Sequence, residues 1–272
     1  MNNDFQNLMK VISRLLEDGG TAVVITVMSG TEAIGSKLLV QESGETFGSL
    51  GDQHLDTAAT GNALTFLQSR DDTRTISFSE LDPNFASDKQ ILLLYERLQP
   101  SPRLVVCGAG HVGASLAKLG RFVGYHTTLI DDRDEFVDPT RFPHEQIELV
   151  VAQNWGDAVK EAIGNGRGVA VAIVTRGHNE DEECMHAVVA TNPDYVGLIG
   201  SKRRTNIVIE NLRRAGVSEA KLKNIRAPIG LDIGAVTPEE VAMSIIAEIV
   251  SERHGREGRS LSAWRRSDDQ PN

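Results

Sequence analysis

The sequence contains little cysteine, few aromatic residues and no long apolar segment. Its 272 residues include only two cysteines, Cys107 and Cys184, and aromatic residues make up 5% of the chain. Two cysteines cannot form a disulfide framework, and these two lack the spacing of a metal site, so we expect no metal centre and a reducing, cytoplasmic environment. No segment approaches the roughly 20 apolar residues of a membrane span, and the N-terminus has no secretory-signal pattern. We therefore expect no membrane attachment.

The formal net charge of −10 also excludes classes of function. Nonspecific binding to nucleic acid or to an anionic membrane requires a positive surface, so neither partner is expected. Between residues 202 and 226, however, eight lysines and arginines face only two glutamates. This segment fits a site for a small anionic ligand, and it fits equally well a helix face whose charges point to water.

The first hundred residues combine helical and strand-like patterns. Apolar residues recur at helical spacing from Phe5 to Leu16, and strand-like runs follow at 21–28, 37–42 and 45–50. Residues 71–88 are polar and aperiodic. A last strand-like run, 91–98, leads to Pro100-Ser101-Pro102, where proline favours a boundary. The pattern predicts a small α+β domain over residues 1–99.

Beyond this boundary, strand-like and helical runs alternate up to residue 215. Such alternation is typical of a parallel sheet with helices on both faces, so the sequence predicts an α/β, Rossmann-like domain over residues 100–252. Its last helix begins at Thr237-Pro238-Glu239-Glu240, a capping box with proline at the first helical position. The polar residues 253–272 are predicted to be a disordered tail.

A glycine-rich turn joins the first strand and first helix of this second domain. Gly108-Ala109-Gly110-His111-Val112-Gly113 follows the apolar residues 104–107 and precedes a helix of small and apolar residues, which is the context of a dinucleotide-binding turn. Gly108 would permit the tight turn, Gly110 the approach of a pyrophosphate and Gly113 close packing of helix on strand. His111 and Val112 would lie at the helix N-terminus near the phosphates.

Two charged residues after the second strand of this domain bear on the choice of nucleotide. Asp131 lies 23 residues after Gly108, where a carboxylate usually binds the ribose hydroxyls. A carboxylate there favours NAD over NADP, whereas Arg133 opposes that preference because it would attract a 2′-phosphate.

Further motifs follow in the second domain. They are Thr175-Arg176-Gly177-His178, then Gly197-Leu198-Ile199-Gly200-Ser201-Lys202-Arg203-Arg204, then Ala227-Pro228-Ile229-Gly230-Leu231-Asp232-Ile233-Gly234. In this order they resemble the xanthine dehydrogenase accessory protein family, the XdhC/CoxI type. The resemblance implies a two-domain factor that binds molybdenum cofactor, supports its sulfuration and delivers it to a molybdenum hydroxylase, with a cysteine desulfurase as second partner. The resemblance implies a chaperone and not a turnover enzyme, so no catalytic residue is assigned. It also implies a homodimer.

The resemblance and the α/β pattern together assign the candidate site. Lys202, Arg203 and Arg204 follow a predicted parallel strand, whose carboxyl end is where ligands of open α/β sheets bind. Thr175 and His178 follow the preceding strand. Asp232 lies in a glycine-bordered loop and either contacts the ligand or ties its own turn together.

The first domain matches the family less closely. Gly48-Ser49-Leu50-Gly51 fits, but the family usually continues with Gly-Gly-Cys, whereas this chain has His54 at the cysteine position. An imidazole can ligate a metal but cannot carry a persulfide, so direct sulfur handling by this predicted loop is in doubt.

Two other functions fit the dinucleotide turn. One is an NAD(P)-dependent oxidoreductase, in which His178 or Lys202 would have to act as acid or base. The other is a nucleotide-sensing regulatory module, although such modules lack the Ala-Pro-Ile-Gly-Leu-Asp-Ile-Gly loop.

Overall fold

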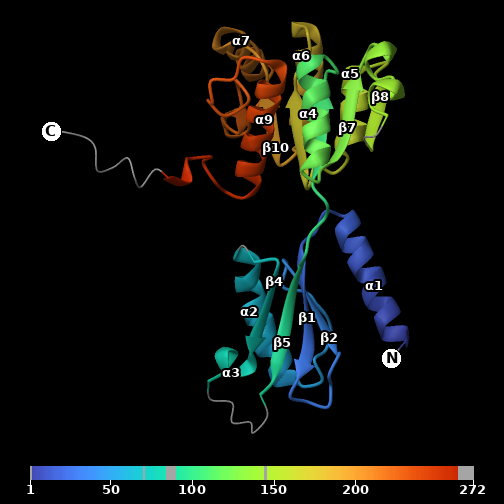
Figure 1. The fold of residues 1–272 in the computed structure, drawn as a ribbon, viewed down its shortest axis with the longest axis vertical. Helices are drawn as coiled ribbons and strands as arrows, with labels where there is room; N and C mark the ends of the chain where they lie inside the picture. The colour runs from blue at the N-terminus through green and yellow to red at the C-terminus, as the bar shows by residue number, and fades with distance from the viewer. Residues whose placement is uncertain (1, 70, 84–89, 144–145, 263–272) are drawn as a thin grey trace, which may run out of the picture. The chain divides into compact units, whose positions relative to one another are not determined.

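The computed structural model describes residues 2–69, 71–83, 90–143 and 146–262. The chain forms two compact units, residues 1–100 and 101–272 (Figure 1). In the described residues, the helices are too short or too polar to span a membrane. Of the predicted tail, residues 253–262 are described and residues 263–272 lie outside the described residues.

The N-terminal unit is a five-stranded antiparallel sheet with a helix on each face (Figure 1). The strand order is β3-β2-β1-β5-β4, and the strands are β1 (Ala22–Ser29), β2 (Lys37–Gln41), β3 (Thr46–Gly48), β4 (Thr73–Ser77) and β5 (Leu92–Leu98). Helix α1 (Asn2–Glu17) packs on one face against Val24 and Leu39, and α2 (Gln53–Gln68) covers the other face against Val23 and Ile25. Successive residues of β1 thus point to opposite layers, as strand pleating requires.

The sequence prediction was wrong for two parts of this unit. Residues 73–81, predicted to be aperiodic, form β4 and the short helix α3 (Phe78–Leu81), while residues 84–89 lie outside the described residues. The reason is tertiary: β4 is an edge strand with a single buried residue, Ile76, so it shows no alternation. In addition, His54 lies in the first turn of α2 and not in a loop.

The C-terminal unit confirms the predicted Rossmann-like α/β fold. All pairings in its six-stranded sheet are parallel, in the order β11-β10-β9-β6-β7-β8. The strands are β6 (Arg103–Cys107), β7 (His126–Asp131), β8 (Ile147–Val151), β9 (Val169–Ile173), β10 (Tyr195–Leu198) and β11 (Ile225–Arg226). After β6 the chain forms β7 and β8 on one side of that strand, and it then crosses over to form β9 on the other side. The topological switch point, where such sheets bind ligands, therefore lies between β6 and β9.

Helices cover both faces of this sheet (Figure 1). Helices α4 (His111–Phe122) and α9 (Pro238–Arg253) pack together over Leu104 and Val106. The opposite face, which includes Val105, is covered by α5 (Trp155–Ile163), α6 (His178–Thr191) and α7 (Lys202–Arg214), and α8 (Glu219–Lys223) follows α7. Two 3₁₀ turns, η1 (Asp134–Phe136) and η2 (Pro139–Arg141), lie between β7 and β8. The core clusters on the two faces of the sheet consist of apolar side chains.

Candidate functional site at the carboxyl edge of the parallel sheet

The glycine-rich turn occupies the switch point and is tightly packed. Gly108 has φ +109°, a conformation that favours glycine, and a Cβ there would lie 2.7 Å from the Val174 carbonyl oxygen at the end of β9. A Cβ on Gly113 would lie 1.7 Å from the Gly108 carbonyl oxygen, so α4 packs directly on the end of β6. Around a Cβ on Gly110 there is no heavy atom within 4 Å. The three glycines thus have the geometry expected for turn, open approach and close packing.

Helices α4, α6 and α7 are among the helices that begin at this edge of the sheet. Helix α4 begins at His111, α6 at His178 and α7 at Lys202, each shortly after the carboxyl end of its preceding strand. Helix N-termini present unpaired N–H groups and a partial positive charge, both of which favour anions. Gly110 and Gly177 cap α4 and α6 without a side-chain hydrogen bond, so no side chain of the cap competes for these N–H groups. The edge is therefore suited to a phosphate-bearing ligand.

Asp131 is engaged by the protein itself. Its side chain is 2% exposed, and it accepts hydrogen bonds from the Ala109 N–H at 2.6 Å and from the Arg133 N–H, Nε and Nη2 at 3.1, 2.8 and 3.0 Å. Burial raises the pKa of this carboxyl, but the hydrogen bonds from Arg133 and Ala109 outweigh burial and hold the pKa below its ordinary value. To bind a ribose, Asp131 would have to give up one of these donors. In the structure it fixes the glycine-rich turn and orients Arg133.

The Arg133 guanidinium lies close to an aromatic ring. Its Cζ is 3.5 Å from the centroid of Phe136 in η1, and the side chain is 26% exposed. The hydrogen bond to Asp131 is the main cause of the raised pKa of Arg133. Arg133 thus keeps its charge and a fixed orientation at the end of β7.

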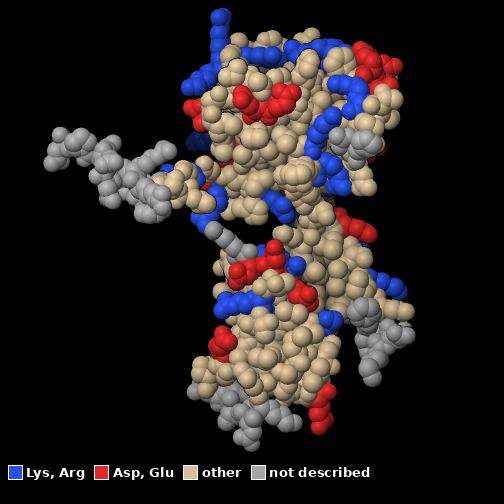
Figure 2. Space-filling model, in the orientation of Figure 1, with Lys and Arg blue, Asp and Glu red and all other residues tan. Residues whose placement is uncertain are grey.

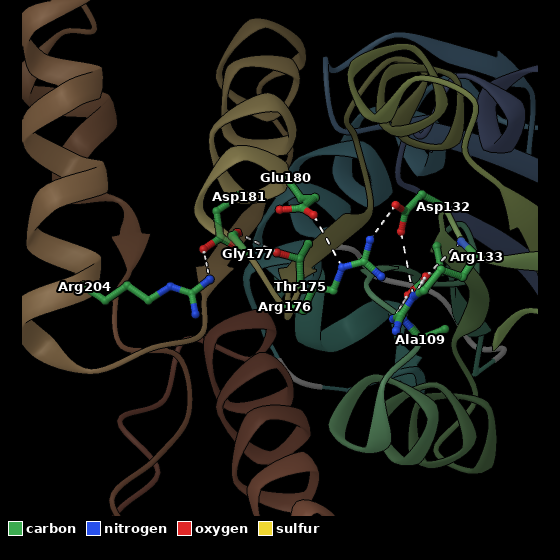
Figure 3. A network of polar contacts seen from close by, with 10 residues as sticks. Ala109, Asp132, Arg133, Thr175, Arg176, Gly177, Glu180, Asp181 and Arg204 are labelled. Carbon is green, nitrogen blue, oxygen red and sulfur yellow. Dashed lines mark hydrogen bonds and ion pairs between the residues drawn. The ribbon is translucent and has the colours of Figure 1, made fainter.

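A second buried carboxylate, which the sequence analysis missed, holds the start of α7. Asp181 in α6 is fully buried and accepts hydrogen bonds from the Thr175 hydroxyl at 2.5 Å and from Arg204 Nη2 at 2.5 Å (Figure 3). Arg204 Nε is buried without a hydrogen-bond partner among the described residues. Thr175 is therefore a buried support, not an exposed ligand contact. The only sequence signal for Asp181 was its place in the first turn of a predicted helix.

The basic segment 202–226 divides into separate groups. Lys202 and Arg203 are exposed at the start of α7 and form no ion pair with the described residues. Arg213, near the other end of α7, pairs with Glu210 and Glu219. Figure 2 shows Lys and Arg side chains gathered at the top of this unit. Only the first group lies at the carboxyl edge of the sheet, so the interpretation as a solvated helix face holds for the remainder of α7.

The four remaining candidate residues, which lie in or next to helices and loops at this edge, differ in their exposure and contacts. His111 and His178 are the first residues of their helices and are not buried. Val112 is half-buried against the core beside α4. Asp232 is exposed and has no hydrogen-bond partner among the described residues, so it does not tie its own turn together. That loop is held instead by Glu248 of α9, which accepts the Gly230 N–H hydrogen bond at 2.9 Å.

His54 belongs to the N-terminal unit and forms a separate group there. Its Nε2 lies 2.8 Å from Asp82 Oδ2, and its ring meets Phe78 edge-on with centroids 5.8 Å apart. The turn Gly48-Ser49-Leu50-Gly51 precedes α2. It is tied to that helix because Asp56 accepts hydrogen bonds from the Leu50 N–H and the Ser49 hydroxyl. Among the described residues, no three His, Cys, Asp or Glu side chains are grouped so as to hold a metal ion.

Comparison with known proteins identifies both units. Residues 104–249 match the XdhC Rossmann domain, and residues 15–79 match the XdhC and CoxI family. Uncharacterized protein YqeB of Escherichia coli K12 is 34% identical over 157 residues, which cover 58% of this chain and 28% of that protein. A probable xanthine dehydrogenase subunit of Bacillus subtilis is 28% identical over 184 residues, which cover 68% of this chain and 52% of that protein. This chain thus spans about half or less of the length of these two relatives.

Two further proteins match over nearly the whole chain. The molybdenum cofactor insertion chaperone PaoD of E. coli K12 is 21% identical over 290 residues, which cover 93% of this chain and 90% of that protein. The crystal structure of a xanthine dehydrogenase from Bacillus halodurans superposes with a TM-score of 0.65 at 21% identity, covering 92% of this chain and 68% of that chain. At this identity the structural likeness shows the fold alone.

Proposed function

The chain belongs to the XdhC and CoxI family, and we propose that it binds molybdenum cofactor and assists its insertion into a molybdenum hydroxylase of the xanthine dehydrogenase type. The names of two relatives support this role: one is a molybdenum cofactor insertion chaperone and the other a probable xanthine dehydrogenase subunit. The hydroxylase is the proposed recipient. A cysteine desulfurase partner and a homodimer are further expectations from the family resemblance.

The carboxyl edge of the parallel sheet is the observation that carries this proposal. Molybdopterin is a phosphorylated, anionic ligand. Its phosphate would be held by the N–H groups at the start of α4, above Gly110, and by the cations Lys202, Arg203 and Arg204. The buried Arg204 Nε, which has no partner among the described residues, supports this assignment, because a buried donor needs an acceptor. The proposed site is completed, as lining or support, by Val112, His111, Thr175, His178 and Asp232.

The same edge would accept a nucleotide, alone or as part of the cofactor. Asp131 would support such a ligand indirectly, since it fixes Ala109 and Arg133, and Arg133 would present the charge. An NAD(P) cofactor of the chain itself remains the alternative, and it predicts hydride transfer from NADH to a small carbonyl compound.

The N-terminal unit would not handle sulfur in the way that a family member with cysteine at this position could. His54, paired with Asp82, occupies the position where the family usually has cysteine. An imidazole cannot carry a persulfide, so we propose that this chain protects and transfers the cofactor while sulfur is supplied by another protein.

The test is the cofactor content of the purified chain. The protein is produced in a host that makes molybdenum cofactor and in one that does not, and released pterin and nucleotide are quantified. We expect about one pterin per chain from the first host and none from the second, with the Gly110→Val variant as a control that lacks pterin in both. Bound NAD(P) without pterin in either host would overturn the proposal and favour an oxidoreductase.

A further inference from the structure

An ion pair spans the end of β6, where the glycine-rich turn begins. Arg176 follows β9 and Asp132 follows β7, yet Arg176 Nη2 lies 2.8 Å from Asp132 Oδ2. In the sheet, β6 lies between these two strands. Two strand spacings are about 10 Å, so the two side chains must reach toward each other across the end of β6. Figure 3 shows Arg176 between Asp132 on one side and Glu180 on the other.

Stability does not account for this arrangement. The Arg176 side chain is 49% exposed and that of Asp132 is 33% exposed. The second contact of Arg176, from Nε to Glu180 Oε1, is long at 3.5 Å. Ion pairs this exposed contribute little to folding, because water screens them and two long side chains lose freedom. The carboxylates therefore hold Arg176 in place only weakly.

The guanidinium is well placed to bind phosphate. Its fork of N–H donors binds a carboxylate and a phosphate with similar geometry, so a phosphate above the turn can replace Asp132 as its partner. Asp132 also lies 3.9 Å from Arg133 Nε, so its carboxylate is shared between two arginines. The Asp131 carboxylate, in contrast, is buried and cannot be displaced as easily.

We propose that Arg176 is a phosphate-binding residue of the crevice and that Asp132 competes with the ligand for it. The ligand group is a pyrophosphate or phosphomonoester seated on the turn at Gly108–Gly113. The inference rests on the proposed function only in requiring that a phosphate-bearing ligand binds at this edge.

The two variants Arg176→Gln and Asp132→Asn test this by effects of opposite sign. Binding of inorganic pyrophosphate and of ADP to the full chain is measured by calorimetry at constant ionic strength, because salt weakens such contacts. We expect Arg176→Gln to weaken binding about tenfold and Asp132→Asn to strengthen it about threefold to fivefold, in line with charge-assisted contacts. In the Arg176→Gln background, Asp132→Asn should change affinity by less than about twofold.

The chain offers a matched control at the far end of α7. Arg213 and Glu219 form an exposed ion pair at 2.5 Å, so Arg213→Gln and Glu219→Gln make the same changes of charge away from the crevice. Both should leave the affinity unchanged within about twofold. If Asp132→Asn weakens binding, or if the controls match the crevice variants, the competition between Asp132 and the ligand is refuted.

The outcomes separate this inference from the proposed function. Pyrophosphate binding that Arg176→Gln leaves unchanged overturns the role of Arg176 while the phosphate site stands. No binding of either probe by the wild-type chain overturns the role of Arg176 and the phosphate site together, and the pterin content of the purified chain then decides the proposed function.

Discussion

The two edges of the parallel sheet both carry cations, but they differ in what surrounds them. At the carboxyl edge, arginines lie beside the N-termini of α4, α6 and α7. At the amino edge, a cavity of about 390 Å³ lies where β10 and β11 begin, and its lining includes Lys221, Arg226 and Glu252. The C-termini of α6 and α9 end beside this cavity, so backbone carbonyls add negative charge there.

The difference in surroundings favours the carboxyl edge over the amino-edge cavity as the ligand site that we propose. In the amino-edge cavity, Arg226 pairs with Glu252 at 2.7 Å and Lys221 donates to the Val189 carbonyl oxygen at 2.8 Å. At the carboxyl edge, Lys202 and Arg203 form no ion pair with the described residues, and Arg204 Nε has no hydrogen-bond partner among them. Two cations without an ion pair, one buried donor without a partner and the helix N-termini favour an anion at the carboxyl edge over the amino edge.

The largest expected effect is that of Gly113→Ala. The new Cβ would lie 1.7 Å from the Gly108 carbonyl oxygen, a backbone atom, so α4 would have to move away from β6. We expect a loss of about 3 kcal/mol in the free energy of unfolding, measured by urea denaturation. Gly110→Ala is the control, since its Cβ meets no atom within 4 Å and the loss of the N-cap glycine should cost about 1 kcal/mol at most. Equal losses in both variants would contradict the tight packing of this turn.

Asp131→Asn should cost about 2–3 kcal/mol at neutral pH, because a neutral amide replaces the buried carboxylate and cannot accept both charge-assisted hydrogen bonds from Arg133. The pKa of Asp131 is lowered in the folded chain, so its contribution is complete above the ordinary pKa of an aspartate, about 4, and is lost as the pH falls further. The difference in unfolding free energy between wild type and variant should therefore shrink below about pH 4. A difference that grows toward acid pH would show that the sign of this pKa shift is wrong.

Gly110→Val should abolish the phosphate site without unfolding the protein. Its side chain would project into the open space above the start of α4, where the phosphate has to approach. We expect affinity for pyrophosphate to fall at least about tenfold, roughly 1.4 kcal/mol, while the melting temperature falls by only a few degrees because valine is a poorer N-cap than glycine. Full affinity in this variant would place the ligand elsewhere, including the cavity at the amino edge.

The smallest effect is expected for Arg226→Gln at the amino edge. Arg226 and Glu252 are 36% and 39% exposed, so their ion pair should contribute less than about 1 kcal/mol. Affinity for pyrophosphate should change by less than about twofold. Calorimetry on Arg226→Gln and on Gly110→Val compares the two edges directly. A roughly tenfold loss of pyrophosphate affinity in Arg226→Gln would favour the amino edge as the ligand site.

Local sequence patterns were sufficient for most of the C-terminal unit. The alternation of strand-like and helical runs predicted the parallel sheet, and the spacing of Gly108, Gly110 and Gly113 predicted their three different environments. The N-terminal unit was harder to predict. Helix α2 was missed because two of its four buried residues, Ala59 and Ala63, are small and the apolar Leu64 is exposed, so the helical pattern is weak. Strand β4 was missed because an edge strand buries little.

The sequence by itself determined the fold class, the glycine turn and the family, because these depend on short-range spacing and on motif order. Tertiary structure alone decided how the charges are used. It placed Asp131 in hydrogen bonds with Ala109 and Arg133. It also paired Asp181 with Arg204, and Asp132 with Arg176 across the end of β6. Except for Asp131 and Arg133, these partners are 22 to 44 residues apart, and only the order of the parallel strands brings them within hydrogen-bonding distance.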